Sequence, residues 1–168
     1  MRSETIDLIE RVRRRLAEAS APCSIAGAAT EAQIAAAEET LGCAFPPSYR
    51  QFLKRFGALR IPTHLGVVHD FVGIDPSADG KSVVDRTLAA RTENRLGPNL
   101  VVVGLGADYR EWFCIDVDRA RDDGECPILM FDSRDNALDQ QFYEDFGQMV
   151  REVLGFVEQN LAGDLSQA

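Results

Sequence analysis

The spacing of apolar residues predicts a helix at the start of the chain. Ile6, Ile9, Val12 and Leu16 recur at intervals of three and four, which places them on one stripe of a helix, with arginines between them. Small residues over 20–29 then predict a loop that connects this helix to the rest of the chain.

A second helix is marked by signals at both of its ends. Thr30 and Gln33 fit a capping box, in which each side chain satisfies a free backbone N–H of the other residue. Ile34, Ala37 and Leu41 follow as the apolar stripe. Gly42 stands where a residue in the left-handed conformation ends a helix.

A third helix begins and ends just as clearly. Pro46 and Pro47 suit a first helical turn, because the N–H groups there have no partner inside the helix. Gly57 closes the segment. The apolar residues between these ends, at helical spacing, are Tyr49, Phe52, Leu53 and Phe56.

After Gly57 the period of the pattern changes, and most of the remaining segments are expected to be strands. The expected strands are 67–74, 100–105, 111–117 and 127–132. A helix is expected over 82–95, with Val84 and Leu88 facing inward. A closing helix keeps a period of 3.6 residues from Phe142 to Val157.

The order of these elements indicates an α+β protein. The connections 106–110 and 118–126 are short and polar, as antiparallel hairpins require. Because no helices cross over between these strands, a doubly wound parallel sheet is excluded.

Composition adds a strong and uneven negative charge. The chain has 168 residues, enough for about one domain, and a formal net charge of −9. This balance argues against proteins that grip nucleic acid phosphates or an anionic membrane surface. Residues 106–148 contain twelve acidic residues and four arginines, which leaves −8 in that stretch alone.

The expected compartment is the cytoplasm. No apolar leader follows the N-terminus, and the longest apolar run, 100–105, is too short to span a bilayer. The four cysteines include no C-x-x-C pair, and a chain of this length can bury a core without disulfides. We therefore expect free thiols.

Candidate catalytic and cofactor groups are weak, so no catalytic, cofactor or metal site is expected. Gly104 and Gly106 begin like a dinucleotide fingerprint, but the third glycine is missing and a strand follows. His64 and His69 lack further ligands at metal-site spacing, so both are interpreted as partly exposed residues near a turn. Cys114 lies in mid-strand, as a small packed residue does.

One set of motifs in the two short helices resembles a known family. The order of residues is similar to the opening signature of the SMI1/KNR4, or SUKH, superfamily. The matching residues are Ile34, Glu38, Leu41-Gly42, Phe45-Pro46, Tyr49, Phe52-Leu53 and Phe56-Gly57. Phe56 stands where the family often has asparagine. Later matches are Val72-Gly73-Ile74, the strand 100–105, Trp112 to Asp116, Pro127-Ile128 and the helix with Phe142, so the resemblance spans about 30–158.

The resemblance implies a fold and a function. The fold is an α+β domain with a central, mostly antiparallel sheet and helices packed around it. Bacterial members of the superfamily are typically immunity proteins that bind and neutralise a cognate polymorphic toxin, often a nuclease, whereas fungal members regulate cell-wall synthesis. We accordingly divide the chain into an N-terminal helix and connection (1–29), an SMI1/KNR4-like domain (30–160) and a tail (161–168).

The acidic stretch supplies a candidate surface for a basic partner. Carboxylates facing the basic groove of a nuclease raise the rate and specificity of binding, and Tyr and Trp are common interface anchors. The candidate partner-binding residues are Asp108, Tyr109, Glu111, Trp112, Asp118, Asp122, Asp123 and Glu125.

Two alternatives remain open. The acids can be the solvated side chains of a hairpin that protect sheet edges from aggregation, and Trp112 can belong to the core. The protein can also be an intracellular regulator or scaffold that binds an endogenous protein. A monomer or a weak dimer is expected in either case.

Overall fold

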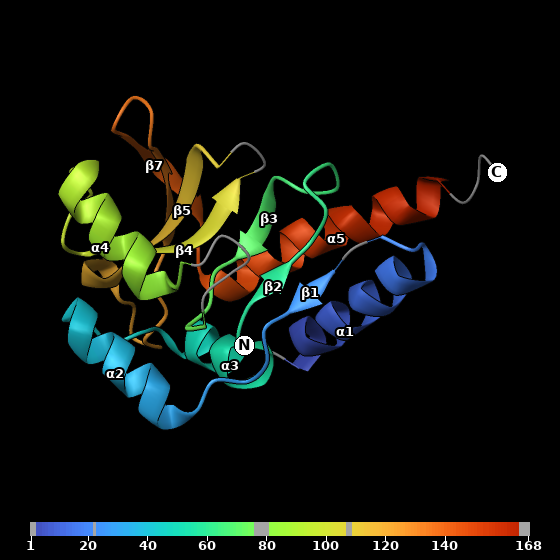
Figure 1. Ribbon diagram of the computed structural model, residues 1–168, viewed down its shortest axis with the longest axis horizontal. Coiled ribbons are helices and arrows are strands. Elements are labelled where there is room, and N and C mark those ends of the chain that lie inside the picture. The colour runs from blue at the N-terminus through green and yellow to red at the C-terminus, as the bar shows by residue number, and fades with distance from the viewer. Residues whose placement is uncertain (1–2, 22, 76–80, 107–108, 165–168) are drawn as a thin grey trace.

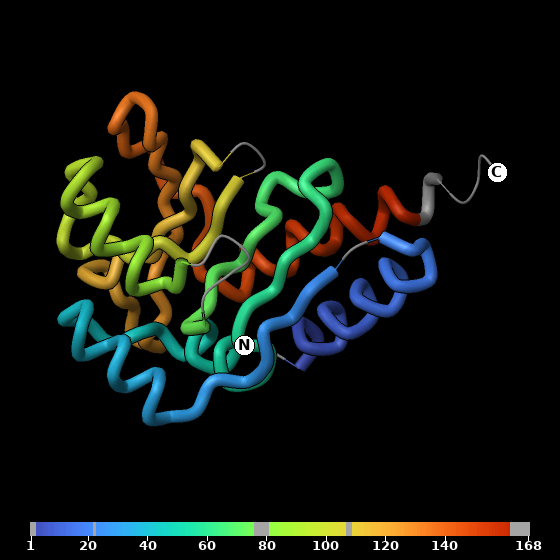
Figure 2. The backbone as a smooth tube through the Cα atoms, viewed as in Figure 1, coloured from blue at the N-terminus to red at the C-terminus, as the bar shows by residue number. Residues whose placement is uncertain are grey.

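The structure is a computed structural model that describes residues 3–21, 23–75, 81–106 and 109–164. Figures 1 and 2 show its elements and the path of the chain. The helices are α1 (Ser3–Glu18), α2 (Glu31–Leu41), α3 (Pro47–Phe56), α4 (Val83–Glu93), the short 3-10 helix η1 (Val117–Arg119) and α5 (Phe146–Asp164). The strands are β1 (Ser24–Ile25), β2 (Leu59–Arg60), β3 (Val68–Phe71), β4 (Leu100–Gly106), β5 (Glu111–Asp116), β6 (Ile128–Asp132) and β7 (Ala137–Tyr143).

The seven strands form one antiparallel sheet in which each strand pairs with the next one along the chain. Helices α3 and α5 pack against one face of this sheet, α4 lies against the opposite face, and α1 runs alongside α5 (Figure 1). This arrangement confirms the α+β class and the antiparallel hairpins.

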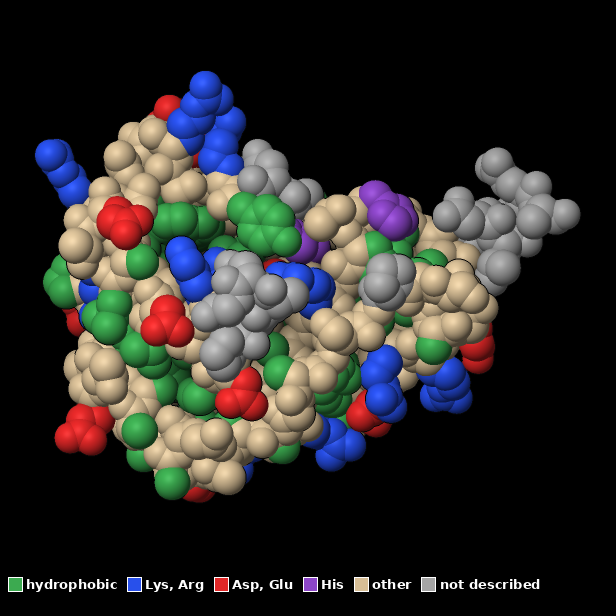
Figure 3. Space-filling view, in the orientation of Figure 1, with side chains coloured by type: hydrophobic (Ala, Val, Ile, Leu, Met, Phe, Trp, Pro, Cys, Tyr) green, Lys and Arg blue, Asp and Glu red, His purple; other side chains and the backbone are tan. Residues whose placement is uncertain are grey.

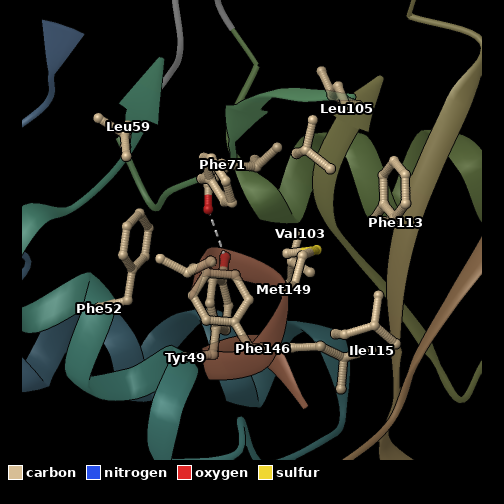
Figure 4. Packing of buried hydrophobic residues seen from close by; sticks show 14 of the residues in the cluster. Tyr49, Phe52, Leu59, Phe71, Val103, Leu105, Phe113, Ile115, Phe146 and Met149 are labelled. Carbon is tan, nitrogen blue, oxygen red and sulfur yellow. Dashed lines mark hydrogen bonds between the residues drawn. The ribbon is translucent and has the colours of Figure 1, made fainter. Parts of the chain in front are cut away.

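An aromatic cluster fills the space between α3, α5 and the sheet (Figure 4). The rings of Tyr49 and Phe52 from α3 lie 4.9 and 5.1 Å from the ring of Phe146 in α5, and Phe52 reaches Phe71 in β3. The Tyr49 hydroxyl donates a hydrogen bond to the Val72 carbonyl at 2.8 Å. A buried tyrosine thus has its one polar group satisfied, as core packing requires.

The predicted signals at the ends of α2 and α3 are confirmed. The Thr30 hydroxyl accepts from the Gln33 N–H at 3.2 Å, and the Gln33 side chain accepts from the Thr30 N–H at 2.8 Å. Gly42 ends α2 with a φ of 71°. Pro47 occupies the first position of α3.

Three glycines let separate segments approach closely where α3 ends. Gly57 has a φ of +72°, and a Cβ there would lie 1.7 Å from the Gly27 carbonyl oxygen. A Cβ on Gly73 would lie 2.1 Å from the Gly57 carbonyl oxygen. Because only glycine fits at these points, β2 can pass next to the segment that precedes α2, and Figure 2 shows the two running together.

The predicted inward face of α4 is wrong at Leu88 and correct in part at Val84, which packs against the core. Val84 is half-buried and Leu88 is exposed. The buried positions are Val83, Thr87 and Ala90. The Thr87 hydroxyl accepts a hydrogen bond from the Val102 N–H at 3.1 Å, so the Thr87 face of the helix lies on β4 and Leu88 points outward.

The predicted start of the closing helix is also wrong, since Phe142 lies in β7. Residues 133–136 form a turn in which Asn136 has a φ of 49°, and the chain returns along β6 as a strand. The Asp145 carboxylate accepts from the Gln148 N–H at 2.7 Å, so α5 begins at Phe146. Strands β1 and β2, of two residues each, lie in segments where no strand was expected.

Helix α1 is part of the same core as the rest of the chain. Ile9, Val12 and Leu16 are buried as predicted, and they belong to the hydrophobic cluster that includes the sheet. Arg11 on α1 forms an ion pair with Glu158 on α5 at 2.6 Å. Helix α5 continues through Asp164, past the expected start of the tail at 161. The boundaries 29/30 and 160/161 stay predictions.

Candidate interaction surface

The candidate partner-binding residues fall into two groups at opposite ends of β5. Tyr109, Glu111 and Trp112 lie at its start, and the acids of 118–125 follow its end. Six residues of strand span roughly 20 Å at about 3.3 Å per residue. The structure therefore does not bring the two groups into one patch. Asp108 lies outside the described residues.

At the start of β5, Trp112 is held in place but only half-buried. Its indole N–H donates to the Tyr109 carbonyl at 3.0 Å, and its ring stacks on Phe131 with the centroids 5.7 Å apart. Together with Leu105 and Ala90, Trp112 lines a pocket of about 90 Å³ between α4 and the sheet. The side chain is neither fully in the core nor free.

His69, expected to be partly exposed, is fully buried, while His64 is exposed as predicted. The pairing of β3 with β4 shifts register between Val68 and Asp70, and such a bulge re-aims side chains. The His69 ring meets the Tyr109 ring edge-to-face, with the centroids 4.7 Å apart. Figure 3 shows the histidines beside apolar side chains on this face.

Both histidines, Tyr109, Cys23 and Arg60 line an open groove of about 520 Å³ next to β1. In the part of the chain that the structure describes, no three His, Cys, Asp or Glu side chains are grouped so that they could hold a metal ion.

At the other end of β5, Glu125 is used inside the fold. Its carboxylate accepts hydrogen bonds from the Ser48 N–H at 2.9 Å and from the Ser48 hydroxyl at 2.6 Å. Pro46, the N-cap residue of α3, has no side-chain cap to offer. A carboxylate at a helix N-terminus satisfies a free N–H and interacts favourably with the helix dipole. Glu125 therefore caps α3 from a distant part of the chain.

Asp123 is also engaged within the protein. It pairs with Arg121 at 3.2 Å, and Arg121 continues to Asp145 and to the Glu144 carbonyl. The hydrogen bond from Arg121 lowers the pKa of the Asp123 carboxyl, so the group is charged at neutral pH and its charge is locally balanced. This network fastens the loop to the start of α5.

Asp118 and Asp122 differ from these two acids. Both are exposed, and neither forms a hydrogen bond or ion pair with a residue that the structure describes. Of the four acids in this loop, these two are therefore open to a partner, whereas Asp123 and Glu125 hold the loop together.

The groups weighed for catalysis are unsuited to it. Cys114 is fully buried in β5, and burial raises the pKa of its thiol far above the ordinary value, so it stays protonated. Asp123 has a lowered pKa, the opposite of what a general acid needs. Gly104 and Gly106 lie in β4, and the next element is a strand. All four cysteines are free thiols.

Strand β7, which was not expected from the sequence, adds the exposed apolar side chains Leu138 and Phe142. Phe142 lies toward the acidic loop, and Leu138 lies near the other end of the strand, opposite Phe131. The polar run 133–136 between two apolar segments is a turn signal that predicts a hairpin at this point. Within the described residues, no helix is long and apolar enough to cross a membrane.

Comparison with protein families gives one finding. The sequence model of the SMI1 / KNR4 family (SUKH-1) matches residues 28–152. This range begins just before α2, contains β2 to β7 and ends inside α5. It includes the α2–α3 motif, the acidic loop and Trp112.

Proposed function

The chain belongs to the SMI1 / KNR4 family (SUKH-1), and we propose that it is a non-catalytic immunity protein that binds and neutralises a cognate bacterial toxin domain in the cytoplasm. The toxin domain would present a basic surface, as nucleases do. The protein would act by covering that surface, and no cofactor is needed for this.

One observation carries the proposal beyond the family. The excess of negative charge is concentrated in residues 106–148, and the described structure leaves Asp118 and Asp122 in this stretch exposed and without a partner. Carboxylates of this kind attract a basic partner over long distances and exclude partners of like charge.

The burial of the candidate nucleophile also supports a binding role. The Cys114 thiol is enclosed between the sheet and its helices and has a raised pKa, so it offers neither access nor a thiolate. Occlusion of a toxin requires a stable, charged surface, and the sheet with its bound loop provides one.

Co-expression tests the proposal directly. The C-terminal domain of the toxin encoded beside this gene is expressed in cells with and without this protein. We expect the cells to survive only when both are present and the two proteins to elute as one complex. If the cells die equally fast in both cases and no complex elutes, the immunity function is wrong. Binding to a housekeeping protein instead would favour a regulatory or scaffold role.

A further inference from the structure

Strand β7 is the least covered strand of the sheet. All of its residues from 137 to 142 are exposed, on both faces of the strand, and only Tyr143 is buried. It is the last strand in the sheet order, so among the described elements no strand pairs with its outer edge. Such an edge offers backbone N–H and C=O groups to an incoming strand.

Two large apolar side chains on β7 are open to solvent, and one of them, Phe142, packs on a neighbouring ring. Leu138 is 51% exposed and lies opposite Phe131 of β6. Phe142 is 45% exposed, and its ring packs edge-to-face on Phe113 with the centroids 5.8 Å apart. A side chain that is already ordered on one side loses little entropy when a partner covers the other.

The surroundings of β7 are acidic. Arg119 donates to the Gln141 side chain at 2.9 Å, which ties the loop with Asp118 and Asp122 to the strand. The exposed carboxylates on or next to β7 that form no ion pair with a described residue are Asp118, Asp122, Asp135, Asp139 and Glu144. The exposed arginines nearby are Arg119, Arg134 and Arg121, and Arg121 is paired with Asp123 and Asp145. The edge is therefore suited to a cationic segment.

We infer that β7 is the docking edge for the basic toxin domain, which adds an extended segment to the sheet, covers Leu138 and Phe142 and pairs its cations with the surrounding carboxylates. This inference rests on the proposed immunity function and assigns the toxin-binding surface to β7.

A second copy of the chain is a poorer occupant. The pairing of β7 with β6 shifts register twice, between Ile128 and Leu129 and between Leu129 and Phe131. Bulges of this kind bend an edge strand and hinder its pairing with an identical edge. Two copies would also bring together two edges that carry the same exposed acidic side chains.

Binding measurements on matched variants test the inference. Leu138→Lys and Phe142→Ala change the docking edge, and Leu88→Lys on α4 and Phe156→Ala on α5 make the same changes at comparably exposed positions elsewhere (40% and 52%). The probe is an inactive variant of the toxin domain encoded beside this gene, with Kd measured by calorimetry. We expect each β7 variant to raise Kd at least about tenfold and each control to stay within about twofold.

Hydrogen exchange separates direct docking from damage to the fold, because Phe142→Ala also removes a contact with Phe113. In the complex of the unaltered chain, the amides of 137–142 should become protected, while those of α4 should not change. Leu138→Lys should abolish this protection and leave the exchange of the free protein unaltered.

The possible outcomes are distinct. A complex whose Kd is unchanged by the β7 variants, with no protection of 137–142, overturns the docking edge and leaves the immunity function standing. No complex at all overturns both. A dimer of the free protein that Leu138→Lys dissociates assigns the edge to a second copy and overturns the inference.

Discussion

Glu125 and Asp122 stand three positions apart in one acidic loop and have opposite roles. The Glu125 carboxylate accepts two hydrogen bonds from Ser48 at the start of α3, whereas Asp122 faces solvent without a partner in the described chain. Replacing either residue changes the net charge by the same amount, so only a folding measurement distinguishes their contributions. At the scale of single residues, the hydrogen bonds of a carboxylate decide whether it stabilises the fold or remains open to a partner.

Glu125→Gln should lower the free energy of unfolding by about 1 kcal/mol, because the amide weakens the cap on α3 and its interaction with the helix dipole. Asp122→Asn, the matched control, should change it by less than about 0.5 kcal/mol. Urea unfolding followed by circular dichroism measures both. Equal effects of the two substitutions would show that Glu125 does not cap α3.

The elements that were predictable from sequence are those specified by residues near in the chain. The ends of α2 and α3 are set by the capping box, Gly42 and Pro47. Each of these signals acts within one or two helical turns, so it can be recognised from neighbouring residues alone. Strands β1 and β2 exist because Ser24 and Ile25 pair with residues more than thirty positions away, and a two-residue strand has no period to detect. The inward face of α4 depends in the same way on a distant backbone group, the Val102 N–H.

Gly57 and Gly42 end neighbouring helices with positive φ angles of 72° and 71°, but their ψ angles differ, at −65° and 28°. Nothing lies within 4 Å of a Cβ on Gly42. Gly42→Ala should therefore lower the free energy of unfolding by only about 1 kcal/mol, because alanine must adopt the left-handed conformation there. A Cβ on Gly57 would collide with the Gly27 carbonyl, so Gly57→Ala should cost more than about 4 kcal/mol or prevent folding.

Thermal unfolding of the two glycine variants, side by side, checks this difference. Similar melting temperatures for both would mean that β2 and the segment before α2 do not approach as closely as the structure shows.

For the whole molecule, the distribution of charge along the chain was a poor guide to its distribution in space. The acidic stretch 106–148 includes all of β5, so its residues near Trp112 and those near Asp118 lie at opposite ends of that strand. The stretch also includes β7, a strand that was not expected and whose residue Phe142 was placed in the closing helix. The candidate site could therefore be predicted as a region of sequence but not as a surface.

Charge reversal at the exposed acids tests the electrostatic part of the proposed function. Asp118→Lys with Asp122→Lys should slow association with the toxin domain about tenfold at low salt and reduce its dependence on salt. Stability should not change, because neither carboxylate has a partner in the described fold.

Glu4→Lys with Glu18→Lys on α1 changes the net charge equally and controls for the overall field. Stopped-flow measurements of both double variants supply the comparison. If the two double variants slow association equally, Asp118 and Asp122 contribute to association only through the net charge of the protein.

The buried phenol of Tyr49 allows unfolding of the core at alkaline pH to be followed by ultraviolet absorbance. Burial raises the pKa of Tyr49 well above its ordinary value of about 10, so the folded protein keeps a proton that the unfolded chain releases. Its contribution to stability is complete below pH 10 and falls as the pH rises further. Tyrosinate absorbance from this ring should therefore appear only at the pH at which the protein unfolds. Tyr49→Phe should remove this absorbance change and leave the tyrosinate absorbance that appears at lower pH unaltered.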